Sequence, residues 1–161
     1  MPEEDADLVS ALFAALASTE TDMTIFFRRL ADVDVTASVS AEARVATVAE
    51  ALYDPDAARS AAVEPLARWL DRYAARARLD DTSPAARRAR MNLANPLYVP
   101  RNYLVHEVIE AATRGEVDPL VQLMDVLRRP YVEQPGRDAF ARKRPDWARH
   151  VPGCSMLSCS S

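Results

Sequence analysis

Apolar side chains recur every three or four residues along most of this chain, which is the spacing of one face of an α-helix. Leu8, Leu12 and Leu16, for example, share one face of the segment 7–18. No segment shows the sustained alternation of apolar and polar residues that is typical of a β-strand. The pattern therefore predicts an all-α fold with about seven helices, over residues 7–18, 22–33, 40–52, 57–78, 83–95, 101–114 and 118–130.

Residues that commonly begin or end helices support these boundaries. Asp22, Ser40 and Ser83 are good N-caps, because a short polar side chain accepts a hydrogen bond from a free backbone N–H of the first turn. Pro65 lies inside the fourth segment, where its missing N–H predicts a kink or a restart. Gly115 follows the sixth segment and is a typical C-cap.

The last predicted helix has its apolar residues on one face, which we expect to point inward: Leu120, Leu123, Met124 and Leu127. From Tyr131 on, the chain is rich in proline and charge, and one short helical turn is predicted at about residues 138–142. We therefore expect a helical domain over residues 1–130, followed by an irregular tail over residues 131–161.

A chain of 161 residues is the size of one ordinary domain, and 49% of its residues are hydrophobic, so a compact fold needs no disulfide or metal. The net charge of −4 argues against a general electrostatic attraction to nucleic acid or to an anionic membrane. All but one of the 20 basic residues are arginine, which we attribute to codon usage in a GC-rich genome. The arginine pairs at 28–29, 87–88 and 128–129 are expected on exposed helix faces, in salt bridges.

No signal or membrane segment is predicted. The N-terminus is acidic, whereas a secretory signal begins with basic residues, and no apolar run approaches the roughly 20 residues of a membrane span. We therefore expect a soluble, cytoplasmic protein. In that reducing compartment the only two cysteines, Cys154 and Cys159, are expected to be free thiols or a redox pair rather than structural disulfides.

A search for catalytic or ligand-binding patterns yields no candidate residues. The segment HEVIE, which begins at His106, lacks the second histidine of a zinc-binding HExxH helix. The two histidines and two cysteines are not at zinc-finger spacing. With only three glycines, the chain has no glycine-rich phosphate-binding loop. We therefore predict no catalytic, cofactor-binding or metal-binding residues in this chain.

Several short motifs carry a family resemblance. In the longest, residues 95–131, an Asn-Pro precedes Arg-Asn-Tyr-Leu, one helix ends in Arg-Gly-Glu, and a leucine-rich helix ends in Arg-Pro-Tyr. DMTIFFRRLADV (22–33) lies upstream and RPDWA (144–148) downstream. In this order and spacing the motifs resemble the C-terminal region of the selenoprotein O family, the kinase-like protein adenylyltransferases. That family usually has an apolar residue and a glutamine where this chain has Pro100 and His106.

The resemblance implies a kinase-like fold that binds ATP with magnesium or manganese and transfers AMP to Ser, Thr or Tyr hydroxyls of protein substrates. The residues that perform this transfer belong to an N-terminal and central region of the family, and nothing in this chain matches them. By resemblance, the chain is the C-terminal helical part of such an enzyme and is inactive alone. It then needs a kinase-like core, in cis or in trans, and an apolar surface left exposed without that core predicts self-association.

A second class of function stays open. The chain is either part of an adenylyltransferase, as a truncation or one half of a split gene, or it is a stand-alone helical interaction module without enzymatic activity, or a degenerate gene fragment. A kinase-like region encoded in an adjacent reading frame would favour the first interpretation.

The resemblance also assigns a role to the last cysteine. The family ends in a cysteine or selenocysteine followed by Ser-Ser, which corresponds to Cys159, Ser160 and Ser161. In members with cysteine, this residue is implied to form a disulfide with a cysteine of the kinase-like region, so that redox state controls activity. Cys154, five residues earlier, is either an incidental thiol or the partner with which Cys159 closes a small ring in a flexible tail.

Overall fold

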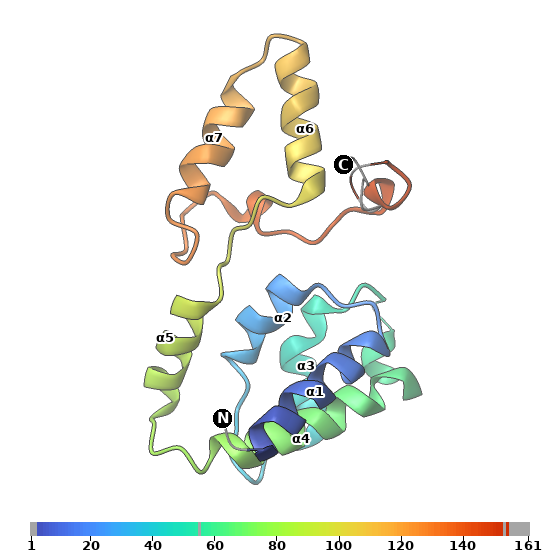
Figure 1. The fold of residues 1–161 in the computed structure, drawn as a ribbon, viewed down its shortest axis with the longest axis vertical. Coiled ribbons are helices and arrows are strands. Elements are labelled where there is room, and N and C mark those ends of the chain that lie inside the picture. Colours follow the sequence, from blue (N-terminus) through green and yellow to red (C-terminus); the bar gives the residue numbers. More distant parts are fainter. Residues whose placement is uncertain (1–2, 55, 153, 155–161) are drawn as a thin grey trace. The chain divides into compact units, whose positions relative to one another are not determined.

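The computed structural model describes residues 3–54, 56–152 and 154 of the chain (Figure 1). Within these ranges the chain forms seven α-helices and five short 3-10 turns, and an isolated antiparallel bridge joins Thr21 to Leu52 outside any strand. The predicted all-α fold is therefore confirmed. The helices belong to two compact units, Met1–Asn95 and Pro96–Ser161, which we call the N-terminal and C-terminal units.

The N-terminal unit is built around one hydrophobic core. Its helices are α1 (Glu3–Ala17), α2 (Met23–Leu30), α3 (Ala41–Val48), α4 (Glu64–Ala77) and α5 (Pro84–Ala94), and its 3-10 turns are Ala49–Ala51, Ala57–Arg59 and Ala61–Val63. Helix α4 packs against both α1 and α3, while α2 packs against α3 and α5. Phe26, Leu66 and Leu70 are completely buried at the centre. Because each buried side chain of this size contributes roughly 1.5–3 kcal/mol, apolar burial is a main source of this unit's stability.

Local sequence signals set the helix ends as predicted. The side chains of Asp22, Ser40 and Ser83 accept hydrogen bonds from backbone N–H groups three residues further on, at 3.0, 3.2 and 3.3 Å. Pro65 lies in the first turn of α4, after two 3-10 turns. The backbone N–H groups of a helix's first turn have no acceptor within the helix, so a proline, which lacks this N–H, is tolerated there. A new helix therefore begins at this point, instead of one long helix with a kink.

Aromatic rings link three helices of this core. Phe26 contacts Phe27 edge-on, with ring centroids 5.4 Å apart, and Trp69 at 6.2 Å. Trp69 stacks in turn on Tyr73 of the same helix at 5.3 Å. The indole N–H of Trp69 donates to the carbonyl of Leu8 at 2.8 Å, which ties α4 to α1. Phe26 and Phe27 are adjacent in sequence, and both rings pack within the N-terminal unit, Phe26 in the core and Phe27 against it.

Three arginines hold the loop between α2 and α3 through its backbone. Arg87 donates to the carbonyl of Val33 at 2.6 Å, and Arg78 donates to the carbonyl of Val35 at 2.7 Å. Arg44 donates to the carbonyls of residues 34 and 36, at 3.1 and 2.8 Å. Four consecutive carbonyl groups therefore bind guanidinium groups that come from α3, from the end of α4 and from α5. We call residues 33–36 the carbonyl loop.

The same contacts correct one expectation about the paired arginines. Arg88 is exposed and pairs with Asp32 at 2.9 Å, as expected, whereas Arg87 is buried, with 7% of its surface exposed. Arg87 points inward because it donates both to the carbonyl loop and to the hydroxyl of Tyr73, at 3.0 Å. Arg44 is also buried, and it forms an ion pair with Asp71 of α4 besides its two carbonyl bonds.

The C-terminal unit is a helical hairpin with an irregular segment packed on it. Its helices are α6 (Asn102–Thr113) and α7 (Asp118–Leu127), and its 3-10 turns are Asp138–Phe140 and Asp146–Arg149. The two helices lie side by side and run in opposite directions (Figure 1). Gly115 ends α6 as predicted, with a positive φ of 86° that a side chain would strain.

Residues 131–152 are bound to this hairpin through several hydrogen bonds. The side chain of Gln134 donates to the carbonyls of Val126 and Arg129, at 2.9 and 3.0 Å, and so satisfies the end of α7. The hydroxyl of Tyr103 on α6 donates to the carbonyl of Arg142 at 2.7 Å. The boundary that we expected at residue 130 therefore lies inside the C-terminal unit. The predicted short turn within 138–142 is present at Asp138–Phe140.

One face of α7 differs from the prediction. Leu123 and Val126 are buried against the rest of the unit, and Leu127 is half-buried. Leu120 and Met124, which we expected to point inward, are 40% and 53% exposed. That expectation is wrong because, among the described residues, α6 and residues 131–152 leave one side of α7 exposed.

The carbonyl loop supplies a test of the fold. The substitution Arg44→Lys replaces a planar group with five N–H donors by a single ammonium, so it cannot reach both carbonyls and Asp71 together. We expect the free energy of unfolding to fall by about 2–4 kcal/mol, measured by urea denaturation and circular dichroism. The matched control is Arg59→Lys, whose ion pair with Asp56 is more than 80% exposed on both sides and which should change stability by less than about 0.5 kcal/mol. Equal stability of the two variants would contradict this account.

Candidate functional site

Cys154 is the described member of the cysteine pair that the sequence singles out. Its side chain is buried, with 6% of its surface exposed, and its thiol is unpaired. It belongs to the core of the C-terminal unit, in a cluster with Tyr103, Leu104, Val108, Leu123 and Ala148. Cys159 lies outside the described residues.

The surroundings of Cys154 disfavour its thiolate form. Burial raises the pKa of the Cys154 thiol, and the negative charges of Glu110 and Glu107 raise the pKa further. The thiolate is the reactive form of cysteine, so the thiol group has little nucleophilic character here. Cys154 thus lies as a neutral thiol among the apolar side chains that pack against α6.

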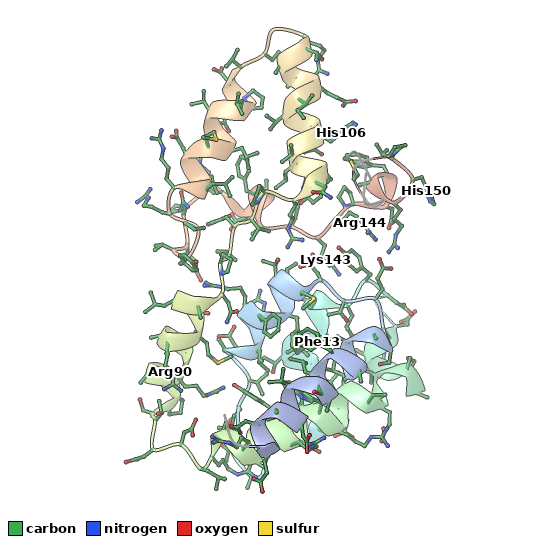
Figure 2. The ribbon with its side chains drawn as sticks, in the orientation of Figure 1. Phe13, Arg90, His106, Lys143, Arg144 and His150 are labelled. Carbon is green, nitrogen blue, oxygen red and sulfur yellow. The ribbon has the colours of Figure 1, made fainter. Side chains whose placement is uncertain are left out.

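His106 is the other residue whose chemistry the sequence raises. Figure 2 shows it on the side of α6 near the segment that carries His150. Its ring lies 6.1 Å from that of Trp147, and its Nδ1 lies 3.8 Å from a carboxylate oxygen of Glu110. Trp147 also contacts the ring of Tyr103 edge-on at 6.5 Å. His106 thus helps to hold the second 3-10 turn of the unit against α6. Within the described ranges, no three His, Cys, Asp or Glu side chains come together as a metal ion would require.

The N-terminal unit has an open cavity of about 650 Å³ beside the carbonyl loop. Arg87 and Arg88 line it from α5, and Asp32 and Asp34 line it from the opposite side. Hydrogen bonds from Thr36 lower the pKa of Asp34, so this carboxylate stays charged. The charges of the cavity wall are engaged with the protein itself, since Arg87 binds the loop carbonyls and Arg88 binds Asp32.

The C-terminal unit has a smaller cavity of about 350 Å³ between α6, α7 and the first 3-10 turn. Leu104, Val108 and Phe140 are among the apolar residues that line it. Its rim carries two exposed ion pairs, Arg142 with Glu107 at 3.2 Å and Arg114 with Glu116 at 3.1 Å. Its shape and lining are those of an apolar recess with a charged edge.

Two helix faces present apolar side chains to the surface. On α1, Val9 and Phe13 lie one turn apart and are both exposed. On α7, an exposed stripe consists of Val117, Leu120, Val121 and Met124, which we call the outer face of α7. The periodic pattern of the sequence predicted an apolar face on this helix, but it placed Leu120 and Met124 in the core, whereas both are exposed. Separately, none of the helices in the described part of the chain has both the length and the apolar character needed to cross a membrane.

Comparison with known proteins identifies relatives of the whole chain. The family model for protein adenylyltransferase SelO matches residues 1–128. The chain is 50% identical over 159 residues to the protein nucleotidyltransferase YdiU of Tolumonas auensis, and 50% identical over 159 residues to that of Xanthomonas axonopodis pv. citri. It is 48% identical over 161 residues to the protein of the same name from Azoarcus sp..

These alignments cover 98%, 99% and 100% of this chain, but only 29%, 30% and 30% of the respective relatives. The chain thus spans about 30% of the length of the curated relatives it matches. The family model covers well over half of the chain and agrees with the resemblance drawn from its motifs. This chain therefore belongs to the protein adenylyltransferase SelO family.

Proposed function

We propose that this chain is the helical part of a protein adenylyltransferase, which transfers AMP from ATP to Ser, Thr or Tyr hydroxyls of proteins. In this proposal, ATP and magnesium or manganese bind in a kinase-like region that lies outside the chain. The observation that carries it is the comparison itself: relatives about 50% identical over nearly all of this chain are named protein nucleotidyltransferases, and the chain is about 30% of their length.

The polar chemistry of the N-terminal unit supports a structural contribution to that enzyme. Phosphate groups are commonly bound by arginine side chains and by free N–H groups at helix starts. Here Arg44 and Arg87 bind backbone carbonyls, and the caps of α2, α3 and α5 are occupied by Asp22, Ser40 and Ser83. These groups stabilise the helices, so the unit fits the role of a rigid support for a catalytic region.

We propose a division of roles between the two cysteines. Cys159 is the family's redox residue, and its disulfide partner belongs to the kinase-like region. Cys154 is a packing residue, which is supported by its burial and by its raised pKa. We place the protein in the cytoplasm, where an unpaired thiol such as that of Cys154 is the ordinary state.

An AMP-transfer assay tests the proposed function. A chimera is made from the Tolumonas auensis relative by replacing its 159 aligned residues with this chain. With labelled ATP and magnesium, we expect the chimera to transfer AMP to protein and the isolated chain to transfer none, because the nucleotide site lies outside the chain. The control is the relative with the aligned residues deleted. Transfer by the isolated chain, or an inactive but folded chimera, would refute the proposal.

A thiol-labelling experiment tests the role of Cys154. In the variant Cys159→Ser, only Cys154 can react with a disulfide reagent. At pH 8 we expect the folded chain to react at least about tenfold more slowly than the same variant in urea, because burial and a raised pKa leave little accessible thiolate. The rate should increase as the pH rises toward that pKa. Free cysteine is the control for the reagent, and equal rates in the folded and unfolded chain would show that Cys154 is reactive.

A further inference from the structure

The outer face of α7 is an apolar stripe that stays exposed in the described part of the C-terminal unit. Val117, Leu120, Val121 and Met124 occupy positions i, i+3, i+4 and i+7, so they share one side of the helix. Between 40% and 56% of each remains exposed. The other side of α7 already packs within the unit through its buried residues. The helix is therefore apolar on two sides, and one of them has no cover among the described residues of its own unit.

The surroundings of this stripe have the composition of a protein interface. Single exposed apolar residues are ordinary, whereas a contiguous group on one helix face marks a contact surface. Exposed polar residues occupy neighbouring positions of the helix: Asp118, Asp125 and Arg128. Arg128 pairs with Asp125 at 3.4 Å. An apolar centre with a charged border is the usual anatomy of a site for another protein surface.

The size of the stripe decides which kind of partner fits. A stable complex of separate chains buries about 800 Å² on each partner, and four half-exposed side chains on a helix of ten residues offer far less. A small patch is sufficient when the partner belongs to the same polypeptide, because tethering gives an effective concentration of about millimolar. The alignment with this chain covers only 29% and 30% of two relatives, so the remainder of the same polypeptide has room for such a partner.

We propose that the outer face of α7 docks, within one polypeptide, onto the part of the adenylyltransferase that lies outside this chain. The inference rests on the proposed function, and it adds the surface through which the helical part is held. The partner surface is apolar opposite Leu120 and Met124, and it carries a basic group opposite Asp118, whose carboxylate borders the stripe.

The double substitution Leu120→Gln and Met124→Gln tests this docking surface in two contexts. In the isolated chain both glutamines stay in water, so we expect the melting temperature to change by less than about 1 °C. In the full-length chimera the same side chains would be buried without hydrogen-bond partners, so we expect it to melt at least about 2 °C lower. The matched control is Leu79→Gln with Leu93→Gln, two exposed leucines of the N-terminal unit, which should leave the chimera unchanged.

An unchanged melting temperature of the folded chimera would overturn the proposal, as would an equal decrease with the control pair. If the isolated chain sediments as a dimer, and the α7 substitutions make it a monomer without affecting the chimera, the occupant is a second copy and the proposal is wrong. Should the chimera not fold, glutamine at the two aligned positions of the full-length Tolumonas auensis relative must lower its melting temperature in the same way.

The docking test is independent of the activity test. A chimera that is destabilised by the α7 substitutions but transfers no AMP would refute only the proposed function. A chimera that transfers AMP, and melts at the same temperature with or without the α7 substitutions, would refute only the docking surface.

Discussion

The N-terminal unit depends on a loop without regular secondary structure. Residues 33–36 direct four consecutive carbonyl groups at arginine side chains. The carbonyl of Val33 is buried, and a buried carbonyl without a donor costs about 1–3 kcal/mol. Arg44, Arg78 and Arg87 supply the donors from α3, from the end of α4 and from α5. One short loop therefore constrains three helices at once. The hydrophobic core determines that these helices collapse together, and the arginine bonds determine where each of them lies relative to the loop.

The range of an interaction along the chain explains which of these features the sequence predicts. A helix start depends on residues three positions apart, so Ser40 and Ser83 are recognisable as caps, and the proline-driven restart of α4 is equally local. The bond from Arg87 to Val33 joins residues 54 positions apart, and no local pattern contains it. Codon usage accounts for an excess of arginine, but it does not account for two buried guanidinium groups. Binding several backbone carbonyl groups from a buried position depends on a planar side chain with several N–H donors, which lysine lacks.

The same reasoning applies to the candidate site. Proline, charge and serine near the C-terminus are typical of a flexible tail, and they led to the expectation of an irregular segment separate from the helices. The contacts that hold residues 131–152 come from far upstream, such as the hydroxyl of Tyr103, which binds the carbonyl of Arg142. The burial of Cys154 follows from them, because its neighbours on α6 precede it by more than 40 residues. Motif order identified the family, whereas the burial of Cys154 is visible only in the packing.

Helix α7 shows why periodicity alone cannot assign a core. A periodic pattern reports that a helix face is apolar, and it is silent on what covers that face. In α7 two apolar stripes lie next to each other, so the sequence pattern merges them into one inward face. The structure separates them, with Leu123 and Val126 buried within the unit and Leu120 and Met124 turned outward.

A surface helix of a complete small domain needs a polar outer side. A helix that is apolar on both sides fits a position between two layers of protein, and the docking proposed for α7 would place it there. In that proposal, the wrong assignment of Leu120 and Met124 and the exposure of the outer face have one explanation: α7 carries a second face for contact outside its own unit.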